Sequence, residues 1–235
     1  MPADFDVKLL EVIPRSSDVA SFRFERPKDF EYKCGQFFFV TVMKDRQALV
    51  HHFSFSSSPT EQSHIEFTTV LRDSEFKRTL RSMSLGDIAG VKGPYGRFTL
   101  DNSLDRIAMI TSGIGITPLR SICRYCADWG LLKDIVLLYG NGNEEQVLFR
   151  EELEVIQDLN RQVRVVNILN NPTPDWKSSR GSIEPRLVQE EIPDFMERTF
   201  YLCGPPAVVE ATQDVLKTLN VPKDQTRIER FPGYE

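Results

Sequence analysis

The 235-residue chain lacks the features that would place it in a membrane or on a nucleic acid. No apolar run approaches the roughly 18 residues of a membrane span, and the first residues have neither the basic region nor the apolar stretch of a signal peptide. A total of 29 Lys and Arg against 34 Asp and Glu gives a net charge of −5, whereas a general nucleic-acid binder normally has a basic excess. We therefore expect no membrane span and no nucleic-acid partner.

Cysteine is also scarce, with four residues in the chain. Cys123 and Cys126 form a CxxC, a spacing that can serve metal or redox chemistry, but no second CxxC and no pair of histidines follows it. The surrounding PLRSICRYCADW has helical spacing, so we interpret both residues as buried helix cysteines and expect no metal site. Sparse cysteines without an export signal favour a reducing compartment, the cytoplasm.

Phenylalanine is unevenly spread, since 12 of the 16 lie in the first 100 residues. Residues 5–100 contain six short runs rich in Val, Phe, Ile and Thr, separated by Pro, Gly, Asp and Ser, as in an antiparallel barrel or sandwich. The segment SEFKRTLRSM (74–83) breaks this rhythm, because Phe76, Leu80 and Met83 recur at the helical period. Ser74 is a suitable N-cap for this predicted helix.

Beyond Leu100, strand-like and helix-like segments alternate, which predicts a parallel sheet with helices on both faces. We place the boundary near DNSLD (101–105). The sequence thus predicts an antiparallel β-barrel domain over residues 1–101 and a parallel-sheet, Rossmann-like domain over residues 102–235. The predicted strands of the second domain are 106–111, 134–140, 164–169, 199–204 and 226–231, and its predicted helices are 117–129, 147–160, 184–191 and 206–219.

Two glycine turns follow predicted strands of the second domain. In TSGIGITPLRS (111–121), Gly113 and Gly115 turn the chain into a helix, and Pro118 suits the first helical turn. Glycines let backbone N–H groups approach a pyrophosphate, and a helix N-terminus favours its negative charge. YLCGPP (201–206) is the second turn, and both lie at carboxyl ends of parallel strands, where ligands bind. Because Pro118 replaces the third glycine of the GxGxxG fingerprint, a tight structural turn is the alternative.

Polar residues of the first domain offer a second ligand surface. In HHFSFSSSP (51–59), Ser54, Ser56 and Ser58 alternate with phenylalanines, so the period of a strand puts the three hydroxyls on one face. RDSEFKRTLR (72–81) sets a helix N-terminus among four cations, which makes an anion site by dipole and by charge. The alternatives are a solvated strand face and a solvated basic helix face.

The order of these segments is more specific than any one of them. HHFS, RDSEFKR, GPYGRF, GIGITP, CGPP and ERFPGYE follow one another along the chain. In that order they resemble the signature of the ferredoxin–NADP reductase family of flavoproteins, over nearly the whole chain. The resemblance implies a flavin-binding barrel, a nicotinamide-nucleotide-binding domain, and electron transfer from NADH or NADPH through bound FAD, with FMN as the alternative flavin.

In this family an aromatic residue stacks on the flavin ring and a hydroxyl residue lies near flavin N5. The matching positions here are Phe53 and Ser54. The family's arginine, which contacts the flavin phosphates, is replaced by His51, and a neutral imidazole is a weaker phosphate partner than a guanidinium. The other flavin-binding residues that the resemblance implies are Val70 and, at the helix whose charge would compensate for His51, Ser74, Lys77 and Arg78.

The resemblance also implies a nicotinamide site in the second domain. Cys203 would lie near nicotinamide C4 and help to place it without acting as a nucleophile, although by itself it is better interpreted as a small core residue. Phe231 would cover the other flavin face and yield to nicotinamide, with Tyr234 as the competing candidate. The implied nucleotide-binding residues are Gly113, Gly115, Thr117, Pro118, Gly204 and Pro205, and the implied catalytic residues are Ser54, Cys203, Glu229 and Phe231.

The sequence indicates the choice between NADH and NADPH less clearly than it indicates the fold. Family members that use NADPH often carry Ser-Arg after the third strand of this sheet, where ILNNPTP (168–174) stands here. The acidic NGNEEQ (141–146) would repel a 2′-phosphate, whereas Lys177 and Arg180 are still placed to reach one. The balance slightly favours NADH.

The resemblance implies electron transfer to a partner such as ferredoxin or to another acceptor, and the sequence does not say which. Because the chain carries no iron–sulfur cysteine run of its own, any cluster must belong to a partner. Docking would use the basic residues Arg72, Lys77, Arg78 and Arg81. His51 motivates a second hypothesis, a flavin or ferric reductase that uses free flavin as a diffusible substrate. A third hypothesis is a non-catalytic electron-transfer subunit that keeps the fold for docking, against which the intact glycine turns count.

Overall fold

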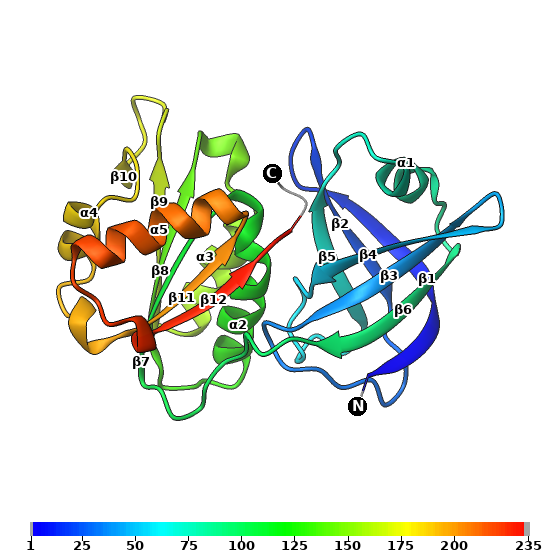
Figure 1. Cartoon of the computed structure of the whole chain (residues 1–235), viewed down its shortest axis with the longest axis horizontal. Coiled ribbons are helices and arrows are strands. Elements are labelled where there is room, and N and C mark those ends of the chain that lie inside the picture. The colour runs from blue at the N-terminus through cyan, green and yellow to red at the C-terminus, as the bar shows by residue number, and fades with distance from the viewer. Residues whose placement is uncertain (1, 233–235) are drawn as a thin grey trace. The chain divides into compact units, whose positions relative to one another are not determined.

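The computed structural model describes residues 2–232 and divides the chain into two compact units (Figure 1). The first unit comprises the chain up to Leu100 together with Arg120–Tyr125, and the second comprises Asp101–Leu119 and the chain from Cys126 on. Within the described residues, no helix has both the length and the apolar character that a bilayer crossing requires.

The first unit is built on one antiparallel sheet that curls into a half-barrel (Figure 1), in the strand order β4-β3-β6-β1-β2-β5. The edge strands β4 and β5 also contact each other, which is why the sheet encloses a core. All six predicted strands are present, and the fourth, expected from HHFSFSS (51–57), lies earlier in the chain than predicted. Their bounds are β1 (Ala3–Pro14), β2 (Val19–Glu25), β3 (Phe37–Lys44), β4 (Gln47–Ser54), β5 (His64–Val70) and β6 (Ile88–Tyr95).

Phenylalanine fills the interior of this half-barrel. The rings of Phe38 and Phe55 stack with centroids 4.2 Å apart, and Phe67 meets Phe38 edge-on at 6.0 Å. Helix α1 (Glu75–Ser82) packs against β3 and β4 and buries Phe76. Its N-cap is Ser74, whose hydroxyl oxygen accepts a hydrogen bond from the third backbone N–H of the helix, so the predicted helix and cap are confirmed.

One buried carboxylate interrupts this apolar core. Glu66 of β5 is fully buried. Its Oε2 accepts hydrogen bonds from Arg23 Nε at 2.8 Å and from Arg15 Nη2 at 3.4 Å, and its Oε1 accepts one from Ser56 Oγ at 2.7 Å. A buried charge is tolerated only when it is paired and hydrogen-bonded, so these partners are required for the segment after β4 to pack against β5.

The second unit is a parallel sheet in the order β10-β9-β8-β7-β11-β12, as predicted for a Rossmann-like domain. Ala108 and Ile110 of β7 join the core that covers one face, while Ile107 and Met109 are fully buried on the other. Figure 1 shows α5 crossing one face of this sheet. The strands are β7 (Arg106–Ser112), β8 (Asp134–Asn141), β9 (Val163–Leu169), β10 (Ser179–Arg180), β11 (Thr199–Gly204) and β12 (Thr226–Arg230). The helices are α2 (Ile116–Asp128), α3 (Arg150–Leu159), α4 (Pro185–Glu191) and α5 (Pro206–Thr218), with short 3₁₀ turns η1 (Gly113–Gly115), η2 (Glu144–Gln146), η3 (Phe195–Glu197) and η4 (Lys223–Gln225).

The differences from the predicted elements are local. Helix α3 begins at Arg150 and not at residue 147, because Phe149 takes a left-handed backbone conformation with φ 57° and ends the preceding turn. The two-residue strand β10 was not predicted, since so short a segment has no periodicity. Cys123 and Cys126 are fully buried in α2, which confirms their interpretation as buried helix cysteines.

The buried position of Glu66 gives a direct test of this packing. We expect Glu66→Gln to lower the free energy of unfolding by about 3 kcal/mol, because it leaves two guanidinium groups without their buried carboxylate. Glu11→Gln is the matched control, since Glu11 pairs with the same Arg23 at 2.8 Å but its side chain is 52% exposed. Its loss is expected to stay below about 1 kcal/mol. Equal losses in urea unfolding of the two variants would contradict this interpretation of the core.

Candidate functional site

Two glycine turns meet at the carboxyl edge of the parallel sheet. Thr111 of β7 is paired with Cys203 of β11, so the turns at Gly113 and Gly204 begin at the same level. Thr111 Oγ1 donates a hydrogen bond to the Cys203 carbonyl at 2.7 Å, and Cys203 Sγ donates to the Gly115 carbonyl at 2.9 Å. A Cβ atom at Gly115 would overlap both the Thr111 hydroxyl and the Cys203 carbonyl. Glycine is therefore required at this position for the two turns to pack together.

The first turn leaves room on its outer side. Gly113 has φ +53°, and a Cβ atom added there would meet nothing within 4 Å. Tyr139 of β8 donates its hydroxyl to the Gly113 carbonyl at 3.0 Å, which fixes the direction of the turn. Thr117 and Pro118 are buried, and the Thr117 hydroxyl donates to the carbonyl of Ile114 at 3.2 Å, so these two residues shape the turn from inside. An open glycine backbone at the start of a helix suits a pyrophosphate.

The second turn anchors the end of the described chain. Gly204 has φ +134°, a conformation that favours glycine, and the two prolines that follow it open α5. Phe231 N donates to the Gly204 carbonyl at 2.9 Å, and Glu229 of β12 is paired with Cys203. Within this unit, the structure thus brings together Cys203, Gly204, Glu229, Phe231 and the turn at Gly113. Tyr234 lies outside the described residues.

Burial shapes the chemistry of this edge. The pKa of the Cys203 thiol lies well above its usual value because the group is buried. A thiol of this kind stays protonated near neutral pH and is a poor nucleophile, in agreement with a positioning role. Burial also raises the pKa of the Glu229 carboxyl, so this group holds a proton to higher pH than an exposed glutamate does.

In the first unit, the predicted row of serines is only partly a surface. Ser54 is the last residue of β4 and is partly exposed. Ser56 and Ser58 are fully buried, so the prediction that they share an open face with Ser54 is wrong. The strand ends at Ser54, and the following segment turns inward, where Ser56 serves the buried carboxylate of Glu66. Period-two spacing does not reveal where a strand stops.

Both faces of the predicted flavin-stacking ring are covered. Phe53 is 6% exposed, and its ring stacks on that of Phe67 with centroids 4.2 Å apart. Lys77 Nζ lies over the ring, 4.3 Å from its centroid, and must occupy the face that Phe67 leaves. Burial and the nearby Lys77 charge lower the pKa of His51 to about 4. At neutral pH His51 is therefore uncharged and supplies no cation for a phosphate. Val70, at the end of β5, is partly exposed.

The basic residues of α1 fall into two groups. Arg78 is exposed and pairs with Asp73 at 2.5 Å, and Arg81 donates to the carbonyl of Leu71. Lys77 is only 6% exposed, and its Nζ donates to Thr69 Oγ1. The predicted docking patch therefore loses Lys77, because this side chain points into the half-barrel and cannot meet a protein partner there.

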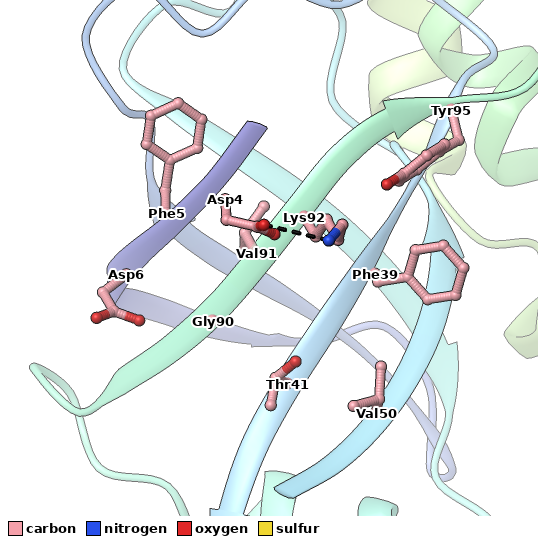
Figure 2. A pocket seen from close by; sticks show the side chains of 10 residues that line it. All are labelled: Asp4, Phe5, Asp6, Phe39, Thr41, Val50, Gly90, Val91, Lys92 and Tyr95. Atoms are coloured by element: carbon pink, nitrogen blue, oxygen red, sulfur yellow. Dashed lines mark hydrogen bonds and ion pairs between the residues drawn. The ribbon is translucent and has the colours of Figure 1, made fainter. Parts of the chain in front are cut away.

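Two hollows elsewhere suit a nucleotide less well. One of about 640 Å³ lies on the outer face of the half-barrel, where Figure 2 shows Phe39 beside Tyr95 and the ion pair of Asp4 with Lys92. Its lining carries two carboxylates, Asp4 and Asp6, and one lysine, Lys92, which is already paired with Asp4, so it offers a phosphate no unpaired cation among the lining residues. The other, of about 670 Å³, lies between α5 and η4 next to Thr226. Thr226 begins β12, so this hollow is at the sheet edge opposite the glycine turns, whereas ligands of such sheets bind at the carboxyl edge.

Sequence reasoning missed the residues that hold the turns in place. Thr111 and Tyr139 are both fully buried. Each donates a hydrogen bond to a backbone carbonyl of a glycine turn, Thr111 to that of Cys203 and Tyr139 to that of Gly113. Each lies in the last residues of an apolar strand, just before a turn. A polar side chain at that position in a buried strand is the signal that would have found them.

The chain matches two known domain models in succession. Residues 6–100 match the model of the oxidoreductase FAD-binding domain, and residues 109–214 match that of the oxidoreductase NAD-binding domain. The glycine betaine monooxygenase reductase subunit of Chromohalobacter salexigens is 28% identical over 221 residues, covering 91% of this chain and 60% of that protein. The chain thus spans less than two thirds of that relative. NADH-cytochrome b5 reductase 1 of Aspergillus terreus is 26% identical over 242 residues, covering 94% of this chain and 80% of that protein.

Solved structures share the fold of the whole chain. The cytochrome b5 reductase domain of Ulva prolifera nitrate reductase superposes with a TM-score of 0.82 at 24% identity, covering 97% of both chains. A ferredoxin NADP+ reductase from Neisseria gonorrhoeae with bound FAD and NADP gives a TM-score of 0.80 at 19% identity, covering 97% of this chain and 98% of that one. The order of the two matched domains and the packed glycine turns lead to one conclusion: the chain belongs to the family of flavoprotein oxidoreductases that join an FAD-binding domain to an NAD-binding domain.

Proposed function

We propose that this chain is an NADH-dependent flavoprotein reductase that passes electrons to a partner protein. The observation that carries the proposal is the packing of two glycine turns at the carboxyl ends of β7 and β11, in a chain whose first unit matches an FAD-binding domain. Bound FAD supplies the redox chemistry, taking a hydride from nicotinamide and releasing electrons one or two at a time. The residues of the chain hold and orient the two cofactors.

On the nucleotide side, the open turn at Gly113 and the start of α2 bind the pyrophosphate in this proposal. The protonated thiol of Cys203 lies beside nicotinamide C4 and helps to set its position. Glu229 holds a proton nearby, which agrees with the raised pKa of its carboxyl. Phe231 is tied to the Gly204 carbonyl through its backbone N–H, and its ring gives way to nicotinamide.

On the flavin side, the partly exposed Ser54 hydroxyl hydrogen-bonds near flavin N5, and Phe53 stacks on the ring system. Ser74 and Arg78 contribute to phosphate binding at the N-terminus of α1, together with Lys77. Val70 contributes a contact at the end of β5. The positive charge that this unit offers to a flavin phosphate comes from α1 and the residues before it, because His51 is neutral and keeps a single N–H donor.

The coenzyme of the proposal is NADH. Glu144 Oε1 accepts hydrogen bonds from Thr173 N at 2.8 Å and from Thr173 Oγ1 at 2.6 Å, and these bonds lower the pKa of its carboxyl. A fixed negative charge therefore lies just beyond the carboxyl end of β8, where sheets of this kind recognise the adenosine ribose. Arg180, a candidate for binding a 2′-phosphate, donates to the carbonyls of Thr173, Pro174 and Trp176. Lys177 remains the competing cation.

The acceptor of the proposal is a protein with a one-electron centre, such as ferredoxin. The support comes from relatives whose names describe a monooxygenase reductase subunit and a cytochrome b5 reductase. Arg72 and Arg81 are the exposed basic residues proposed for docking an acidic partner, since Arg78 is assigned to phosphate binding. The cytoplasm, expected from the sparse cysteines, is the proposed compartment.

A second candidate is a flavin reductase that uses free flavin as a substrate. Two observations favour it: His51 is neutral, and both faces of the Phe53 ring are covered by Phe67 and Lys77. A flavin that must displace Lys77 to stack on Phe53 would be held less tightly than one that enters an open site.

The spectrum of the purified protein separates these functions. We expect a yellow protein that retains FAD through gel filtration and is bleached by NADH under anaerobic conditions, because hydride reduces the bound flavin. A protein that loses its flavin on the column but still oxidises NADH when free flavin is added supports the second candidate. A colourless protein that ignores added FAD and FMN contradicts both.

Alanine substitutions at two glycines test the nucleotide turn. Gly113 and Gly130 have φ +53° and +57°, and a Cβ atom at either would meet nothing within 4 Å. Alanine at each should therefore cost a similar roughly 1–2 kcal/mol in unfolding free energy. Only Gly113→Ala is expected to weaken NADH binding, by about tenfold or more, because its methyl group keeps the pyrophosphate from the turn's N–H groups. Equal NADH affinities in the two variants would place the nucleotide elsewhere.

The choice of coenzyme is tested at Glu144. The wild-type chain should show a kcat/KM for NADH at least about tenfold above that for NADPH. Glu144→Gln keeps an acceptor for Thr173 but removes the charge, and should narrow the preference for NADH about fivefold, because the repulsion of a 2′-phosphate is lost. Glu145→Gln is the control, because Glu145 is the exposed neighbour. A preference for NADPH in the wild-type chain would show that Lys177 prevails.

A further inference from the structure

Lys77 is a buried cation without a carboxylate. Its side chain is 6% exposed, its Nζ donates to Thr69 Oγ1, and no Asp or Glu among the described residues lies within ion-pair distance of it. Another buried cation, Arg120, pairs with Glu61. The buried Lys133 donates to two backbone carbonyls, at 2.6 and 2.9 Å. Lys77 has one hydroxyl acceptor and two aromatic rings.

The surroundings of Lys77 oppose its charge. Nζ lies 4.3 Å from the centroid of Phe53 and 5.7 Å from that of Phe76, and ring faces compensate only weakly for lost water. The charged and titratable groups that face it are His51 on β4, which is neutral, and Arg72 before α1, which repels it. Burial, with a smaller effect of Arg72, lowers the pKa of Lys77 to about 7. A buried cation of this kind is a candidate ligand-binding group, and its burial costs stability.

Lys77 lies close enough to the start of α1 to reach an anion bound there. Lys77 is the third residue of α1, and the helix begins at the exposed N-cap Ser74. A helix N-terminus attracts negative charge, and the flexible four-carbon stem of a lysine can swing its ammonium toward the helix start. The ring of His51 lies beside this helix, 5.5 Å from that of Phe76. Lys77 of α1 can therefore supply the positive charge that the neutral His51 does not.

We propose that Lys77 binds the phosphate of the flavin and, in moving to it, uncovers the Phe53 ring on which the flavin stacks. The inference rests on the proposed function and specifies how this chain selects its flavin. A flavin without phosphate cannot draw the ammonium away, so riboflavin meets a covered ring. FAD and FMN supply the anion, and one movement satisfies the buried charge and opens the stacking face.

Binding of three flavins to the flavin-free full-length chain tests this. Calorimetric titration of the wild-type chain should give an affinity for FAD and FMN at least about tenfold above that for riboflavin. Lys77→Met should lower the FAD and FMN affinities by about 10- to 100-fold, the range of a lost hydrogen bond to a charged group, and bring them to the riboflavin level. Lys77→Arg keeps the charge and should keep the preference. Lys8→Met is the matched control, since Lys8 is exposed on β1.

Two further readouts do not depend on flavin affinity. Without flavin, Lys77→Met should unfold at a higher temperature than the wild-type chain, because a buried charge is removed, whereas Lys8→Met should not. At pH 8 the ammonium is mostly neutral, so wild-type binding of FAD should take up a proton from the buffer. That uptake is detected by comparing buffers of different ionisation enthalpy, and it should vanish in Lys77→Met.

The outcomes separate this inference from the function on which it rests. A wild-type chain that binds no flavin contradicts the proposed function itself. A chain that binds FAD, FMN and riboflavin equally well overturns the inference alone. So does a Lys77→Met variant that keeps the wild-type preference for FAD, or one that is less stable than the wild-type chain in the absence of flavin.

Discussion

The packing of the two glycine turns at the carboxyl edge of the parallel sheet depends on the absence of a side chain at Gly115. Because no Cβ is present, the turn after β7 packs directly on the carbonyl of Cys203 and on the hydroxyl of Thr111. This contact sets the two turns at one level, buries the Cys203 thiol and brings the anchored backbone of Phe231 to the same edge. Pro118 replaces the third glycine of the usual fingerprint without loss of this packing, because it lies inside the helix start.

The two buried charges of the flavin-binding unit are compensated in different ways. Among the described residues, its interior holds one carboxylate, Glu66, which two arginines and a serine satisfy. It also holds one ammonium, Lys77, which donates to the Thr69 hydroxyl and has no carboxylate partner in that part of the chain. The first is a structural element of the half-barrel. The second is better explained by a ligand, because burial and the nearby Lys77 charge lower the pKa of His51 to about 4 and leave its imidazole neutral at pH 7. In the proposed arrangement, Lys77 on α1 supplies the positive charge that was lost when His51 replaced the family's arginine.

Much of the fold could be predicted from local patterns, because apolar runs and turn residues mark the strands and the 3.6-residue period marks α1. The direction of side chains beyond the end of a strand could not be predicted in this way. Ser56 and Ser58 continue the alternation of β4 but turn inward, where Ser56 donates to Glu66, ten residues farther on, and the Ser58 backbone N–H donates to Glu61. The burial of Lys77 and the bond of Glu144 to Thr173 likewise depend on contacts between segments far apart in sequence. The glycine turns were predictable, because their residue types alone dictate the backbone.

In the proposed function, NADH gives a hydride to a flavin held by this chain. The most direct test of this transfer is anaerobic single-turnover bleaching of the FAD-loaded protein with NADH deuterated at one or the other hydrogen of nicotinamide C4. We expect a primary isotope effect for one of the two labels only, because a fixed nicotinamide presents one face to the flavin. Bleaching at the same rate with both labels, or no bleaching, would contradict it.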